Sequence, residues 1–161
     1  MKRNTSKART LLAVCNGEAM PLSRVPDEAF SSEMLGKGFA IEPSDGLFLC
    51  PTDGRVESIA TTKHAYTLLT DEGLDLLVHV GVDTVELDGE GFEPLVSEGQ
   101  RVNAGDPLVR ADPERIRRKG LSAMTAVVIT NPEKTENIEY RFGSVTAGVS
   151  PAMTFRICKK G

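Results

Sequence analysis

The chain has few cysteines and no long apolar run. Its three cysteines, Cys15, Cys50 and Cys158, are odd in number and lack the spacing of metal ligands. We therefore expect reduced thiols that pack in the interior, which is typical of a cytosolic protein, rather than a disulfide framework. No segment approaches the ~20 apolar residues of a membrane helix. The apolar run at residues 11–14 is also shorter than the roughly 7–15 residues of an export signal.

Positive charge is not in excess either. The chain carries 23 acidic residues against 19 basic ones, a net charge of −4 and a pI of about 5.3. This balance argues against a nucleic-acid surface. We interpret the one basic cluster, Arg115, Arg117, Arg118 and Lys119, as a solvated helix face. A length of 161 residues with 40% apolar residues indicates one domain whose core is large enough to fold without disulfides or metal.

Short alternating apolar segments fill most of the chain, and glycine-containing turn pairs such as Asp45-Gly46 and Asp53-Gly54 separate them. The segments predict strands around residues 38–41, 46–50, 55–60, 65–70, 75–80, 107–109, 126–130, 138–142 and 154–158. Many short strands at this spacing predict an all-β sandwich or barrel. A short helix is predicted after the N-cap Asp112, with Pro113 in its first turn and Gly120 at its end. A second helical turn is plausible at residues 27–31.

Two further features concern the organisation of the chain. Residues 1–10, MKRNTSKART, look like a flexible basic lead or linker remnant, so we expect the domain to span residues 11–161. A faint repeat aligns AVCNGEAMPL at residues 13–22 with CPTDGRVESI at residues 50–59, on Gly17 and Gly54. The repeat is compatible with a duplicated strand unit.

One of only two histidines, His79, lies in the most apolar run, LLVHVGVD at residues 76–83. Alternate residues of a strand share a face. The three valines of this run therefore predict the core face, and His79, Gly81 and Asp83 lie on the other side. Glycine next to a side chain opens space, so we expect His79 to face outward or into a groove.

The second histidine, His64, precedes a strand that a turn at residues 71–73 joins to the strand of His79. A hairpin centred there pairs residues whose numbers sum to about 144, which places His64 within a residue of His79. Thr62 shares a face with His64 if this segment is extended. Three chemistries fit: a metal site with Asp83 as at best a third ligand, acid–base hydrolysis without a nucleophile motif, or a histidine nucleophile that accepts a phosphoryl group. The third needs nothing that the sequence lacks, but spacing alone leaves all three open.

Four motifs carry a resemblance to a known family. They are VPDEAFSSEMLGKGFAIEPSDG at residues 25–46, TTKHA at 61–65, HVGVDTVELDGEGFEPLVSEGQRVNAGDPLV at 79–109 and GSVTAG at 143–148. Together they closely resemble the enzyme IIA domain of the glucose class of the bacterial sugar phosphotransferase system, over about residues 11–160. The resemblance implies an antiparallel β-sandwich built from a duplicated strand unit. It also implies that His79 is the phosphorylated residue, that His64 binds the phosphoryl group, and that Thr62 and Asp83 match the motif's threonine and aspartate.

The resemblance further implies a relay. Phosphohistidine HPr delivers the phosphoryl group to His79, through Nε2, and a cysteine of enzyme IIB receives it during sugar uptake. No cofactor is needed, and a metal would require a partner's ligand beside His64 and His79. The implied partners are HPr, the enzyme IIB/IIC permease and regulatory targets, so the chain is cytoplasmic or held at the membrane through the permease, whether free-standing or part of a larger chain.

Docking residues follow from the same resemblance, with two departures. Phe30, Val80 and Gly81 are the expected contacts, but Val80 stands where many relatives carry phenylalanine, and Ala60 stands where an aromatic residue is frequent. We therefore expect fewer large apolar side chains around the site for contact with partners than many relatives have. Two alternatives stay open: a regulator that binds through the His64/His79 face, and a biotinyl- or lipoyl-type carrier, for which Lys63 is the nearest candidate lysine.

Overall fold

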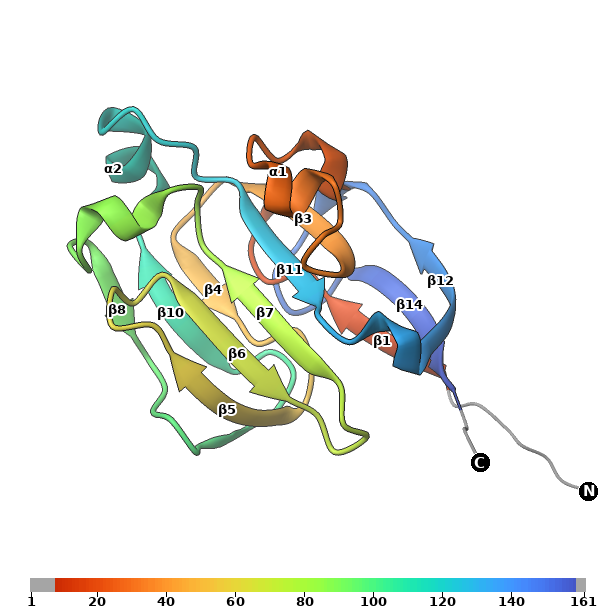
Figure 1. Cartoon of the computed structure of the whole chain (residues 1–161). Helices are drawn as coiled ribbons and strands as arrows, with labels where there is room; N and C mark the ends of the chain where they lie inside the picture. The colour runs from red at the N-terminus through yellow and green to blue at the C-terminus, as the bar shows by residue number, and fades with distance from the viewer. Residues whose placement is uncertain (1–7, 159–161) are drawn as a thin grey trace, which may run out of the picture.

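Antiparallel strands make up nearly all of the regular structure in the computed structural model, which describes residues 8–158 (Figure 1). In chain order the strands are β1 (Ala8–Leu12), β2 (Gly17–Pro21), β3 (Lys37–Pro43), β4 (Leu47–Leu49), β5 (Gly54–Ile59), β6 (Ala65–Leu69), β7 (Asp75–His79), β8 (Phe92–Pro94), β9 (Arg101–Val102), β10 (Pro107–Ala111), β11 (Thr125–Ile129), β12 (Thr135–Tyr140), β13 (Gly143–Val145) and β14 (Pro151–Ile157). The helices are α1 (Glu28–Ser31) and α2 (Pro113–Arg118), and the 3-10 turns are η1 (Leu22–Arg24), η2 (Thr84–Leu87) and η3 (Pro132–Lys134). The all-β class with two short helices is confirmed.

Every predicted strand segment overlaps an observed strand, and both predicted helices form. Asp112 caps α2, since its Oδ1 accepts a hydrogen bond from the backbone N–H of Glu114 at 3.0 Å. Asp27 caps α1 in the same way at 2.9 Å. The sequence pattern missed β1, β2, β8, β9 and β13. Three of these, β8, β9 and β13, are only two or three residues long, which is too short for an alternating pattern to appear.

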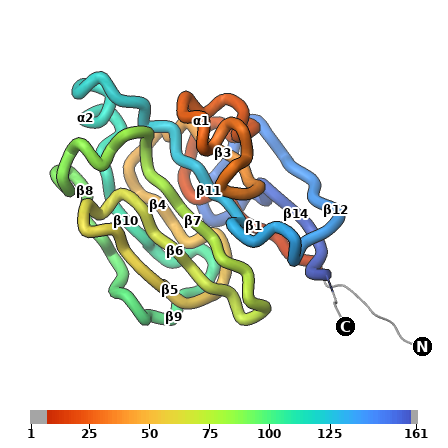
Figure 2. Tube along the Cα trace, in the orientation of Figure 1, coloured from red at the N-terminus to blue at the C-terminus, as the bar shows by residue number. Residues whose placement is uncertain are grey.

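The strands form three sheets. The largest has the order β13-β2-β3-β11-β7-β6-β5-β9, and the two others have the orders β4-β10-β8 and β1-β14-β12. In the view of Figures 1 and 2, β5, β6, β7 and β11 run across the front, and β1, β14 and β12 lie at the opposite end from α2. One hydrophobic core joins all three sheets, because Val78 of β7, Leu108 of β10 and Met153 of β14 belong to the same buried cluster. Burial of this apolar surface is the main source of stability.

The faint repeat corresponds to a repeated contact. The side chain of Asn16 accepts a hydrogen bond from the backbone N–H of Ala147 at 2.8 Å. Asp53, at the aligned position, accepts one from the N–H of Ala104 at 2.8 Å. The strands β2 and β5 begin directly after these two residues. Each of the two repeat segments therefore anchors a later turn through the same side-chain contact, as expected for a duplicated strand unit.

Part of the expected N-terminal lead lies in a strand. Residues 8–10 belong to β1, which pairs with β14 in antiparallel register from Ala8 opposite Arg156 onward. This part of the prediction is wrong, because these residues complete the ladder of β14. Residues 1–7 of the expected lead lie outside the described residues.

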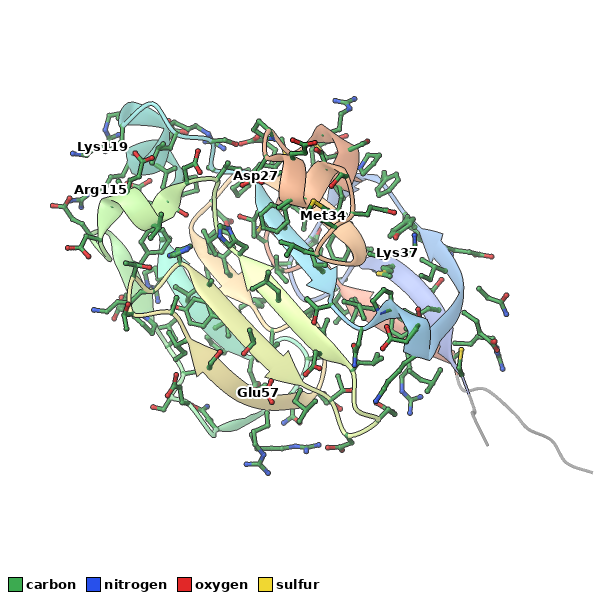
Figure 3. All side chains as sticks on the ribbon, in the orientation of Figure 1. Asp27, Met34, Lys37, Glu57, Arg115 and Lys119 are labelled. Atoms are coloured by element: carbon green, nitrogen blue, oxygen red, sulfur yellow. The ribbon has the colours of Figure 1, made fainter. Side chains whose placement is uncertain are left out.

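The other composition-based expectations concern cysteines, basic residues and membrane spans. Cys15 and Cys50 are fully buried free thiols, and burial raises the pKa of Cys50 to about 12, so neither suits a nucleophile. Arg115 projects from α2 (Figure 3) and pairs with Glu90 at 2.9 Å. Within residues 8–158, no helix is long and apolar enough to cross a membrane.

Candidate functional site

The hairpin of β6 and β7 brings the two histidines together. The strands pair in the predicted register, with Ala65 opposite His79 and Leu69 opposite Asp75. The pairing continues one step beyond β6, since the backbone N–H of Val80 donates to the carbonyl oxygen of His64 at 2.8 Å. The ring centroids of His64 and His79 are 4.8 Å apart, and the rings are nearly perpendicular at 79°. The prediction that this register places the two imidazoles side by side is confirmed.

His79 ends a strand that has partners on both sides. Ala65 of β6 and Ala126 of β11 lie directly opposite it, and opposed residues of antiparallel strands project from the same face of the sheet. Two methyl side chains therefore leave room over the imidazole. The ring of Phe30 from α1 packs edge-on against His79, with centroids 5.1 Å apart and an angle of 61°. Behind His79 the strand is anchored, because Val78 and Val80 are fully buried in the core.

The turn after β7 determines which nitrogen of His79 is free. His79 Nδ1 lies 2.8 Å from the carbonyl oxygen of Gly81. A carbonyl can only accept a hydrogen bond, so the proton of the neutral ring is on Nδ1 and the lone pair is on Nε2. Gly81 adopts a left-handed φ of +80°, which ends the strand alternation. As a result, Val82 packs in the second apolar cluster with Phe30, and the prediction that it joins the core face with the other two valines is wrong.

His64 is held by a turn rather than by an extended segment. Lys63 has a left-handed φ of 65°, and Thr62 Oγ1 reaches His64 Nδ1 at 2.8 Å. The hydroxyl of the fully buried Tyr66 donates to the carbonyl oxygen of Lys63 at 2.9 Å. The condition that residues 62 and 64 share a strand face is therefore not met, but the two side chains come together by another route.

Comparisons with known proteins identify the family to which this sequence belongs. Residues 9–135 match the family described as phosphoenolpyruvate-dependent sugar phosphotransferase system, EIIA 1. The chain is 44% identical over 136 residues to the glucose-specific EIIA component of Staphylococcus aureus (strain COL), covering 84% of this chain and 82% of that one. The chain belongs to the glucose class of the EIIA family.

Two further relatives agree with this EIIA assignment. A glucose-specific EIIA component from Staphylococcus epidermidis (strain ATCC 12228 / FDA PCI 1200) is 41% identical over 136 residues, again covering 84% of this chain and 82% of that one. The solved structure of glucose permease IIA from Mycoplasma capricolum is similar, with a TM-score of 0.85 and 40% identity over 91% of this chain and 96% of that chain. The antiparallel sandwich that the EIIA resemblance implies is confirmed.

Burial lowers the pKa of both histidines of the EIIA chain. His64 is only 7% exposed, and desolvation lowers its pKa, although a hydrogen bond with the backbone of Thr62 opposes the shift. The pKa of His79 is lowered first by desolvation and then by the neighbouring His64, against the opposing effects of the Gly81 carbonyl, Asp27 and Asp83. Both rings are therefore neutral at neutral pH, as a nucleophilic nitrogen requires.

The expected docking residues of the EIIA chain lie mostly beneath the surface. Val80 is fully buried and Phe30 is 4% exposed. The expectation that the side chain of Val80 contacts a partner is therefore wrong. The strand alternation continues one residue beyond β7 and directs this side chain into the core. Gly81 contributes its carbonyl to His79 instead. One exposed apolar side chain nearby in sequence is Val85 of η2, which is 53% exposed. Another is Met34 after α1, which is 77% exposed and is labelled in Figure 3.

Asp83 is exposed and acts on the site through its charge. It adopts a left-handed φ of 59° before η2, and its carboxylate favours the protonated form of His79. Among residues 8–158 no hydrogen bond joins Asp83 to His64, and the partner of His64 Nδ1 is Thr62. The sequence pattern gave no signal for Ala126, which comes from β11 and lies opposite His79. Thr84 lies within the motif that begins at His79, but the sequence analysis assigned it no role.

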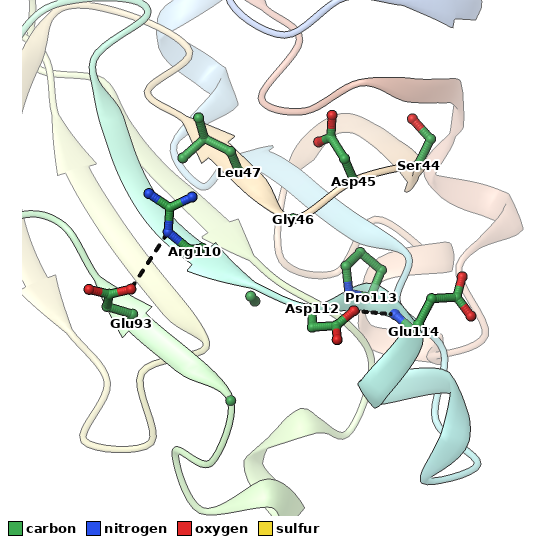
Figure 4. Close-up of a pocket in the computed structure, with 11 residues that line it drawn as sticks. Ser44, Asp45, Gly46, Leu47, Glu93, Arg110, Asp112, Pro113 and Glu114 are labelled. Carbon is green, nitrogen blue, oxygen red and sulfur yellow. Dashed lines mark hydrogen bonds and ion pairs between the residues drawn. The ribbon is translucent and has the colours of Figure 1, made fainter.

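A separate pocket in the described part of the EIIA chain does not contain the histidines. This pocket of about 580 Å³ lies between β4, β10 and the start of α2, and Asp45, Arg110 and Asp112 are among its lining residues (Figure 4). Its ion pair joins Arg110 to Glu93 at 3.6 Å, and both partners are exposed. Residues 8–158 contain no group of three or more histidine, cysteine or acidic side chains that could hold a metal ion. The candidate site is therefore a pair of neighbouring imidazoles, of which His64 is buried and His79 is half-buried.

Proposed function

We propose that the chain is a phosphocarrier that accepts a phosphoryl group on Nε2 of His79 from phosphohistidine HPr and passes it to a cysteine of enzyme IIB. Membership of the EIIA family gives the system in which it works. The observation that carries the proposal is the hydrogen bond from His79 Nδ1 to Gly81, which leaves the Nε2 lone pair free beside His64.

Two displacements at phosphorus make up the relay. In the first, the Nε2 lone pair forms a bond to phosphorus, the P–N bond of phosphohistidine HPr breaks, and its electron pair returns to the imidazole of HPr. In the second, a thiolate of enzyme IIB attacks, and the electron pair of the N–P bond returns to His79 Nε2. Throughout both steps the proton on Nδ1 stays hydrogen-bonded to the Gly81 carbonyl, so the nucleophile keeps its orientation.

His64 and Thr62 stabilise the phosphoryl group during its transfer. When the Thr62 hydroxyl donates to His64 Nδ1, the proton of the neutral His64 is on Nε2, where it can donate to a phosphoryl oxygen. Oriented donors of this kind stabilise charge that develops on oxygen during transfer. The neutral state of His64 fits this role, because a neutral ring donates without trapping the phosphoryl group as an ion pair.

Partners dock on the face around His79, where the transferred group changes the local charge by roughly −2. The exposed apolar side chains of Val85, in the turn that follows β7, and Met34, which follows α1, are available for contact with partners. The second transfer delivers the phosphoryl group to an enzyme IIB/IIC permease, so the chain works in the cytoplasm next to the membrane. A sensor role is compatible with the same face, since phosphorylation alters its charge.

The test is incubation with phosphoenolpyruvate, enzyme I and HPr, followed by intact-mass measurement without acid. We expect the gain of one phosphoryl group that is lost on acid treatment and absent without HPr. His79→Gln abolishes the gain, whereas His64→Gln still accepts the group and transfers it slowly to enzyme IIB. A His79→Gln protein that is still labelled would refute the assignment of the acceptor, and a folded wild-type chain that gains no mass would favour the purely regulatory role.

A further inference from the structure

The orientation of His79 depends on a turn that Thr84 holds from inside. Thr84, the first residue of η2, is fully buried. Its hydroxyl donates to the carbonyl oxygen of Val80 at 2.6 Å. Val80 directly precedes Gly81, whose carbonyl accepts the hydrogen bond from His79 Nδ1. The hydrogen bond from Thr84 therefore holds the Val80–Gly81 peptide. The next peptide carries the Gly81 carbonyl, which selects the tautomer of His79.

Thr84 also packs against Gly81 sterically. A Cβ atom built on Gly81 would lie 2.4 Å from Thr84 Cγ2 and 3.3 Å from its Oγ1. The methyl group of Thr84 thus fills the space that the glycine leaves. Since Gly81 has a φ of +80°, the backbone here has few alternatives with the methyl in place. One side chain therefore constrains the turn both by a hydrogen bond and by contact.

We propose that Thr84 is a positioning residue that holds the Val80–Gly81 turn and so keeps the proton of His79 on Nδ1 and the lone pair on Nε2. Without the hydroxyl, the Val80 carbonyl loses its partner, the Gly81 carbonyl is less well directed, and the ring populates the other tautomer. The effect on transfer rests on the proposed function of His79, but the effect on the tautomer does not.

The test compares Thr84→Val, which keeps the shape and removes the hydroxyl, with Thr84→Ser, which keeps the hydroxyl. The readouts are the ¹⁵N chemical shifts of His79 and the rate of phosphoryl acceptance from HPr. With only two histidines in the chain, His64→Gln assigns the spectrum. We expect T84V to show a mixture of His79 tautomers and an acceptance rate lower by about tenfold, as for the loss of one hydrogen bond, and T84S to restore most of both.

The matched control is Thr135→Val. Thr135 is also buried, and its hydroxyl donates to the carbonyl oxygen of Pro132 at 2.7 Å, but it lies on β12 in another sheet. We expect T135V to leave the tautomer and the rate unchanged. If T84V does not fold, Thr84→Cys, with its weak S–H donor, is compared instead. A wild-type tautomer and rate in T84V would overturn the proposal, whereas a wild-type chain that accepts no phosphoryl group would refute only the proposed function.

Discussion

Gly81→Ala has two separable effects on stability. A side chain at a φ of +80° strains the backbone by roughly 1–2 kcal/mol. The new Cβ would also lie 2.4 Å from Thr84 Cγ2 and 3.1 Å from the carbonyl oxygen of Ser122. Overpacking of this kind costs typically about 1–3 kcal/mol. We therefore expect Gly81→Ala to lower the free energy of unfolding by about 2–5 kcal/mol.

The matched control for Gly81→Ala is Gly99→Ala. Gly99 has a similar φ of +87°, but nothing lies within 4 Å of a Cβ built there. Gly99→Ala therefore reports the backbone strain alone, about 1–2 kcal/mol. Urea denaturation measures both variants, and the difference in free energy gives the cost of the steric clash. Equal destabilisation by the two variants would refute the close packing of Gly81 against Thr84.

A double variant locates the clash. Thr84→Ser removes the methyl group that a Cβ at position 81 would meet and keeps the hydroxyl. In contacting residues, such a pair shows a coupling energy of about 0.5–3 kcal/mol. Gly81→Ala combined with Thr84→Ser is thus expected to be more stable than the sum of the single effects predicts.

Two more predictions concern stability and use the same urea assay. The pKa values of His64 and His79 are lowered by folding, so the unfolded chain binds more protons below about pH 6.5, and stability is full above that pH and falls as the pH drops toward the folded-state pKa values. His64→Gln combined with His79→Gln should flatten this dependence between pH 7 and 5, and an unchanged slope would contradict the shifts. Tyr66→Phe removes the hydrogen bond to the Lys63 carbonyl and should cost about 1–2 kcal/mol, whereas Tyr140→Phe, whose hydroxyl has no hydrogen-bond partner within residues 8–158, should cost little; equal losses would be inconsistent with a bond at Tyr66.

The hairpin between the histidines was predictable because all of its determinants are local. A turn that contains Gly73, with a φ of +91°, sets the register, and period-two alternation then decides which side chains share a face. Ala126 was not predictable in this way. It reaches His79 through the pairing of β7 with β11, and the sequence gives no rule for choosing that partner among the apolar strands.

Val80 shows how a local pattern and a resemblance can disagree. The alternation of the run assigns Val80 to the core, and its side chain is fully buried. The resemblance to relatives with phenylalanine at this position suggested a docking contact instead. The local rule was correct, because the backbone N–H of Val80 donates to the carbonyl oxygen of His64 and so continues the β6–β7 pairing by one residue. The same rule failed at Val82, because a glycine with positive φ lies between and redirects the chain.

The flanking of His79 by Ala65 and Ala126 has a consequence for local opening. Amide groups in the middle of a sheet exchange their hydrogens with water only when a large part of the fold opens, whereas loops open on their own. His79 belongs to a strand that is hydrogen-bonded on both sides, but Thr62 and His64 lie in the connection before β6. His79, the acceptor that we propose, thus shares the slow opening of the whole sheet, whereas Thr62 and His64, which we propose stabilise the transferred group, can adjust locally without moving it.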